Sequence, residues 1–117
     1  VGEPERFDVI CFKSYREKEL LIKRIIGMPG ETVHIENGDI YINGEVIKDK
    51  AGLDKIDDPG LATGNVILSD DEYFVVGDNR AESTDSRSQE VGLVRRSDIL
   101  GKASIVIWPL NHIGIIK

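Results

Sequence analysis

Two Asn-Gly dipeptides, at residues 37–38 and 43–44, constrain the fold more than any other feature of this sequence. Apolar and polar residues alternate before, between and after them. Asn-Gly flanked by such alternation is the strongest short-range signal for a β-hairpin, because both residues tolerate the positive φ angles of a tight turn. The sequence therefore predicts three antiparallel strands, at residues 32–36, 39–42 and 45–47.

Strand patterns also dominate the rest of the chain. Residues 48–65 are polar and rich in Gly, Pro and Asp, which predicts a variable surface excursion. Since no helical pattern exceeds a turn or two, the 117 residues are expected to form a single all-β domain over 1–117, with pairing between its two ends. The remaining expected elements are strands at 7–13, 20–26, 66–68, 73–76 and 101–108, and one helical turn at 94–100.

Composition excludes several classes of function. The net charge is −6 and the basic residues are scattered, so the sequence does not indicate a nucleic-acid-binding protein. A single cysteine, Cys11, excludes an internal disulfide, and its apolar strand predicts a small buried hydrophobe. His34 and His112 lie far apart, so no metal and no cofactor are expected. No apolar stretch reaches the ~20 residues that cross a bilayer. Because the chain opens at Val1, we expect it to be an excised piece or a processed product.

A polar segment follows the strand predicted at 73–76. Its eleven residues, 77–87, are almost all small or polar and include two Asp, two Arg, two Ser, an Asn and a Glu. Acids and bases packed so closely predict a network of ion pairs and hydrogen bonds that holds the loop rigid without an apolar core of its own. A loop fixed in this way is expected to present side chains to a partner.

Lys23 is a candidate for that partner, because it lies in the middle of the apolar strand at 20–26. Side chains alternate faces along a strand, so Lys23 shares a face with Leu21 and Ile25, while Arg24 lies on the other face. Burial lowers the pKa of a lysine and favours the neutral amine, which is a competent general base. The alternative is that the stem of Lys23 lies along apolar surface and its ammonium reaches water.

Together the two segments resemble the bacterial type I signal peptidase (leader peptidase) family. The resemblance is carried by Lys-Arg-Ile-Ile-Gly-Met-Pro-Gly-Glu at 23–31, by Gly-Asp-Asn-Arg at 77–80, and by Ser83, Asp85, Ser86 and Arg87. It covers nearly the whole chain except about 48–65. It implies partly coiled antiparallel sheets or an open barrel, and a membrane-anchored serine endopeptidase that removes signal peptides on the outer side of the cytoplasmic membrane. The chain would be the C-terminal part of the extracytoplasmic catalytic domain.

The resemblance also implies roles for individual residues. Lys23 matches the general base of a Ser–Lys dyad, and Ser83 matches the serine that orients the amine. Asp85 and Arg87 match a charged pair that supports the loop behind the dyad. Asp78 and Arg80 match further supporting positions.

The nucleophile is expected upstream of this chain. In the family it lies in a Ser-x-x-Pro segment next to the membrane anchor, and no such segment occurs here. Ser14, expected on a charged turn, is a poor substitute. The chain alone is therefore expected to be inactive and, without its natural cover, to self-associate. The signal peptide is expected to bind as an extended strand, beside the strand that precedes Lys23 and the strand at 7–13.

Two alternatives stay open at this stage. A noncatalytic β-domain could bind Ca²⁺ or another ligand through the loop at 77–87, with oxygen ligands from Asp78, Asn79, Glu82 and Asp85. Against it, the spacing is not that of an EF-hand, and Arg80 and Arg87 already neutralise the acids. A related self-cleaving Ser–Lys protease is the second alternative, which the run at 77–80 disfavours.

Overall fold

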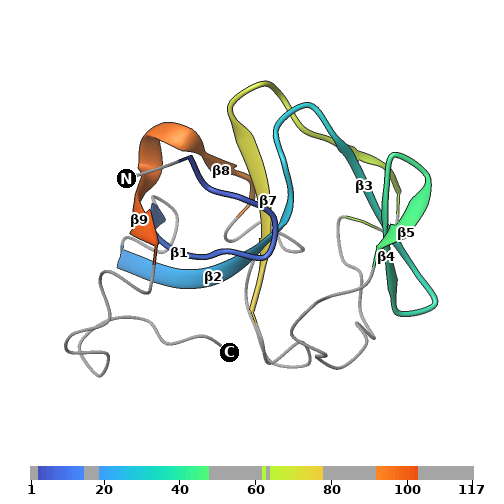
Figure 1. Cartoon of the computed structure of the whole chain (residues 1–117), viewed down its shortest axis with the longest axis horizontal. Helices are drawn as coiled ribbons and strands as arrows, with labels where there is room; N and C mark the ends of the chain where they lie inside the picture. Colours follow the sequence, from blue (N-terminus) through green and yellow to red (C-terminus); the bar gives the residue numbers. More distant parts are fainter. Residues whose placement is uncertain (1–2, 15–18, 48–61, 63, 78–91, 103–117) are drawn as a thin grey trace.

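Two antiparallel sheets make up nearly all the regular structure of the computed structural model, which describes residues 3–14, 19–47, 62, 64–77 and 92–102 (Figure 1). The first sheet has the strand order β8-β7-β2-β1-β9 and the second the order β5-β4-β3-β6. The all-β, antiparallel prediction is therefore confirmed. The strands are β1 (Val9–Ser14), β2 (Glu19–Gly27), β3 (Thr32–Glu36), β4 (Asp39–Ile42), β5 (Glu45–Ile47), β6 (Val66–Ile67), β7 (Glu72–Val76), β8 (Val94–Arg95) and β9 (Ile99–Lys102).

The second sheet contains the predicted hairpins at the predicted residues. Asn37 and Gly38 have φ angles of 53° and 83°, and Asn43 and Gly44 have 52° and 87°. These are the left-handed conformations that two-residue hairpin turns require. The Asn-Gly signal thus fixes both turns and the register of β3, β4 and β5, in which Val33 pairs with Ile42 and Tyr41 with Val46.

The first sheet brings distant parts of the chain together, and Figure 1 shows it curling around one face. β2 lies in its centre between β1 and β7, and β9 pairs with β1, so the expected pairing between the two ends of the chain is confirmed. The pairing of β2 with β7 is not regular. Ile25 faces Val75 but Gly27 faces Phe74, so Ile26 is an extra residue, a β-bulge.

Several predicted boundaries are corrected. The first strand begins at Val9 because Phe7, with a φ of 72°, lies in a turn. The helical turn predicted at 94–100 shrinks to the 3-10 turn η2 (Arg96–Asp98), flanked by β8 and β9. The final strand begins at Ile99, and residues 103–117 lie outside the described part. So does most of the 48–65 excursion, although Ala62 within it is fully buried.

The two faces of the first sheet contribute to two separate cores. One core lies between the two sheets and contains Ile26, Val33, Phe74 and Val76. The other lies on the opposite face, inside the curl, and contains Ile10, Phe12, Leu21, Ile25, Tyr73, Val75 and Val94. Lys23 alternates with Leu21 and Ile25, so its position in the strand is on the curled face.

Candidate active site

Lys23 is buried, with 5% of its surface exposed. Ile10 lies directly opposite on β1, and Leu21 and Ile25 share its face of β2, as the alternation predicts. A side chain this buried keeps little contact with bulk water, which favours the desolvated interpretation over the snorkelling one. Removal from water destabilises an ammonium relative to the neutral amine.

The C-terminal end of β7 lies close to Lys23 in the first sheet. Arg24 pairs with Val76 and Ile25 with Val75, so the next step of this register places Gly77 beside Lys23. Gly77 is buried, and the polar segment continues at the following residue. The start of that segment is therefore adjacent to the lysine in the fold. The other predicted site residues lie outside the described part of the chain: Asp78, Arg80, Ser83, Asp85 and Arg87.

Ser14 is buried at the end of β1, opposite Glu19, rather than on a turn as expected. Its position is on the same face as Lys23 but four residues away along the pair of strands, a backbone separation of about 13 Å.

The described pairing differs between the two sides of β2 near Lys23. β1 pairs with β2 from Arg24 to Glu19, whereas β7 pairs with it on the other side from Arg24 onward. Among the described strands, none pairs with residues 19–22 of β2 on that side. β1, by contrast, lies between β2 and β9, so the expectation that it forms a second edge is wrong for its paired residues.

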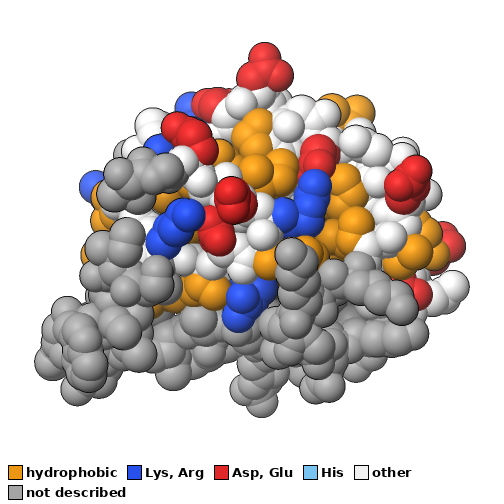
Figure 2. All heavy atoms as spheres, viewed as in Figure 1, with side chains coloured by type: hydrophobic (Ala, Val, Ile, Leu, Met, Phe, Trp, Pro, Cys, Tyr) orange, Lys and Arg blue, Asp and Glu red, His pale blue; other side chains and the backbone are white. Residues whose placement is uncertain are grey.

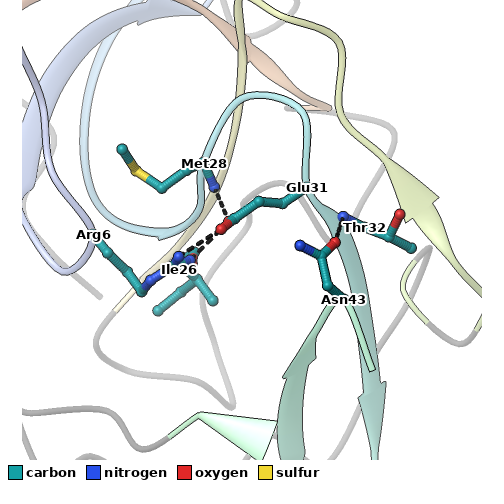
Figure 3. A network of polar contacts seen from close by, with 6 residues as sticks. All are labelled: Arg6, Ile26, Met28, Glu31, Thr32 and Asn43. Carbon is teal, nitrogen blue, oxygen red and sulfur yellow. Dashed lines mark hydrogen bonds and ion pairs between the residues drawn. The ribbon is translucent and has the colours of Figure 1, made fainter. Parts of the chain in front are cut away.

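A network of polar contacts at the end of β2 was not predicted from the sequence (Figure 3). Arg6 donates two hydrogen bonds to Glu31, at 2.8 and 2.6 Å, and a third to the carbonyl of Ile26 at 2.8 Å. Glu31 also accepts the backbone N–H of Met28 at 2.7 Å. The motif at 23–31 pointed to Glu31, but nothing local indicates Arg6, which is 25 residues away.

Charge in this network is well balanced. Burial alone would raise the pKa of Glu31, but the hydrogen bonds from Arg6 and Met28 and the positive charge of Arg6 hold it below its usual value. The hydrogen bond to Glu31 likewise raises the pKa of Arg6, against the opposing effect of burial. Both groups are therefore ionised at neutral pH.

Acidic, basic and apolar side chains of the described residues are interspersed on the face in Figure 2, and no broad basic surface is visible there. No three His, Cys, Asp or Glu side chains of the described residues gather to hold a metal ion. No helix in that part is long and apolar enough to span a membrane. Cys11 is a buried free thiol, and burial raises its pKa.

These features define an all-β domain of two antiparallel sheets, one of them curled around a face that carries a buried lysine beside Gly77. A family model described as "Signal peptidase, peptidase S26" matches residues 1–108. The chain belongs to this family.

Individual relatives agree with the family match. The chain is 36% identical over 120 residues to signal peptidase I S of Bacillus subtilis (strain 168), covering 96% of this chain and 64% of that protein. It is 34% identical over 120 residues to probable signal peptidase I-2 of Synechocystis sp. (strain ATCC 27184 / PCC 6803 / Kazusa), covering 97% and 53%. The chain thus spans between about half and two thirds of the length of these relatives.

The fold is also similar to a solved structure. A crystal structure of a signal peptidase I from Enterococcus faecalis V583 matches with a TM-score of 0.71 and 33% sequence identity, covering 87% of this chain and 97% of that one. The resemblance in sequence and the similarity in fold therefore point to the same family.

Proposed function

We propose that this chain is the part of a signal-peptide-cleaving serine endopeptidase that carries its general base, Lys23. The observation that supports this most is the position of Lys23: buried on the curled face, and beside Gly77, where the polar segment begins. A lysine kept from water next to the start of a segment rich in Ser, Asp and Arg is a combination typical of catalytic sites.

The proposed chemistry assigns one proton transfer to Lys23. Its neutral amine accepts the proton of a serine hydroxyl as that oxygen attacks the scissile carbonyl, and the resulting ammonium returns a proton to the leaving amine. The attacking serine comes from a segment outside this chain, so the chain alone is inactive. Ser83 orients the amine, and Asp78, Arg80, Asp85 and Arg87 support the loop.

The substrate in this proposal is the cleavage region of a signal peptide in an extended conformation. Residues 19–22 of β2 support this mode, because none of the described strands pairs with them on the side of β7, and an added strand there would end beside Lys23. Leu20 on this part of β2 and Leu100 on β9 are exposed apolar side chains, 36% and 61% exposed. Such residues suit contact with the outer surface of the cytoplasmic membrane, to which an anchor outside this chain would hold the domain, and would favour self-association of the isolated chain.

The test is cleavage of a signal-peptide substrate by the encoded protein, with any residues that flank the present chain. Lys23→Met is expected to abolish cleavage, whereas Lys13→Met, which changes an exposed lysine of β1, is expected to retain it. Ser83→Ala is expected to slow cleavage, with Ser88→Ala as the matched control in the same segment. Wild-type rates in Lys23→Met, or equal rates in the two serine variants, would contradict the assignment.

A further inference from the structure

We infer that Arg6 and Glu31 are positioning residues for Lys23, because their ion pair holds the bulge that sets which residues of β7 lie beside the lysine. The inference rests on the proposed function of Lys23, but its structural half depends only on described contacts. Arg6 precedes β1 and Glu31 follows β2, and besides each other they bind the backbone of Ile26 and of Met28, three and five residues beyond Lys23. The two residues would act through the backbone of β2.

The bulge at Ile26 determines the surroundings of Lys23. On the lysine side of the bulge Arg24 pairs with Val76, and beyond it Gly27 pairs with Phe74. Without the extra residue, the pairing on the lysine side would shift by one position, about 3.3 Å. A one-residue slip also exchanges the faces on which side chains point. Lys23 would then lose its place beside the start of the polar segment.

The Arg6–Glu31 pair holds this bulge directly (Figure 3). Arg6 Nη1 donates to the carbonyl of Ile26, the extra residue, at 2.8 Å. The guanidinium is itself fixed by two parallel hydrogen bonds to the carboxylate of Glu31, a bidentate geometry that leaves it little freedom. The same carboxylate accepts the N–H of Met28, in the turn that follows the bulge. A single ion pair thus holds both the bulge at Ile26 and the turn at Met28.

The second sheet provides a rigid base for the pair. The backbone carbonyl of Glu31 accepts the N–H of Leu68 at 2.8 Å, and Gly30 N–H donates to the carbonyl of Ser69 at 3.1 Å. The next residue, Thr32, exchanges hydrogen bonds with Asn43: its N–H donates to Asn43 Oδ1 and its carbonyl accepts Asn43 N–H, both at 2.9 Å. Loosening the pair should therefore release β2 and Lys23 while the second sheet stays in place.

A comparison within the chain supports a role for this pair beyond surface charge. The side chains of Arg6 and Glu31 are 29% and 17% exposed, whereas those of Arg96 and Glu3, another Arg–Glu pair, are 43% and 78% exposed. Arg96 donates a hydrogen bond to Glu3 from Nε alone, at 2.9 Å. Exposed pairs of that kind contribute little to stability or geometry. Glu3→Gln is therefore a matched control for Glu31→Gln.

Two measurements test the inference. In this chain, NMR contacts between Arg24 and Val76 report the register on the lysine side of the bulge. In the encoded protein, kcat and KM for a signal-peptide substrate report the position of the base. Glu31→Gln is expected to weaken the cross-strand contact and to lower kcat by about 10–100-fold, as a displacement of about 1 Å does. KM should rise by a smaller factor than kcat falls, because residues 19–22 of β2, to which the substrate is proposed to pair, keep their pairing with β1. Glu3→Gln should leave both measurements unchanged.

Two results would overturn the inference: unchanged kcat in Glu31→Gln, or lost activity with the register contact intact. If Glu31→Gln does not fold, Arg6→Lys decides on the same measurements, because it keeps the charge but loses the forked geometry. Failure of the proposed function is distinguishable, since Lys23→Met would then cleave as well as the wild type. The NMR contact would still decide whether the pair sets the register.

Discussion

Gly27 is the point where β2 approaches the second sheet most closely, and Gly27→Ala tests that approach. A Cβ at this position would lie 2.6 Å from Val33 Cγ2, 3.0 Å from Leu68 Cδ1 and 3.0 Å from Phe74 Cβ. Carbon atoms in contact normally lie about 3.5–4.0 Å apart. The three neighbours are at most 2% exposed and belong to the core between the sheets, so moving away from the methyl would disturb their packing. The added methyl must push the sheets apart.

The expected loss of stability follows from two opposing effects. Replacing glycine by alanine restricts the unfolded chain, which alone would stabilise the fold by about 0.4–1 kcal/mol where the backbone is unstrained. Inserting a methyl into a filled core costs about 1–3 kcal/mol or more. The overlap with Val33 approaches 1 Å, and the Cβ of Phe74 is fixed to its strand, so the upper end applies. We expect the free energy of unfolding to fall by about 2 kcal/mol, or the Tm by roughly 8 °C at ~4 °C per kcal/mol.

Urea unfolding followed by far-ultraviolet circular dichroism measures this change, with two other glycines as controls. Gly64→Ala meets nothing within 4 Å and needs no positive φ, so we expect equal or slightly higher stability. Gly30→Ala also meets nothing, but Gly30 has a φ of 81°, so it should cost only the backbone strain of about 1–2 kcal/mol. If Gly27→Ala proved as stable as Gly64→Ala, the close approach of the sheets and the reasoning built on it would be wrong.

Two further predictions concern buried groups. Cys11, 3% exposed and with a raised pKa, should react with a thiol reagent at least ~100-fold more slowly in the native chain than in urea. The lowered pKa of Glu31 means that the folded chain binds fewer protons than the unfolded one, so its stabilisation is complete above the ordinary value of 4.5 and is lost as pH falls below it. Glu31→Gln should therefore be less stable at pH 7 and lose less on acidification, and parallel stability–pH curves for the two proteins would refute the assignment.

Local rules carried the sequence prediction of the second sheet, and non-local contacts limited the prediction of the first. Asn-Gly turns involve adjacent residues, so both hairpins could be placed to the residue. The first strand was placed too early because Phe7 adopts a φ of 72°, a conformation that glycine usually takes and that nothing in its composition reveals. The pairing of β9 with β1, which covers an expected edge, joins residues about ninety positions apart, such as Ile10 and Lys102.

For the site as well, local sequence patterns were predictive and non-local contacts were not. Alternation along one strand was enough to place Lys23 among apolar residues, and its burial agrees. Its neighbour across the sheet, Gly77, depends on the register of β7 and therefore on the bulge at Ile26. The ion pair that holds the bulge joins Arg6 to Glu31, and long-range pairs of this kind leave no periodic pattern in a sequence.

The curl of the first sheet and the position of Lys23 have a common origin near Ile25. Phe7 N–H donates to the carbonyl of Ile25 and Ile25 N–H to the carbonyl of Asp8, both at 2.8 Å, so two residues of the N-terminal segment face one residue of β2. This is a second irregularity, on the opposite edge of β2 from the bulge at Ile26. Bulges bend a strand and increase its twist, so two at one level concentrate the bend two to three residues beyond Lys23. Arg6 immediately precedes the first irregularity and donates to the carbonyl at the second, so it joins the two. The curvature that turns Lys23 inward is thus built from the same contacts that set its register.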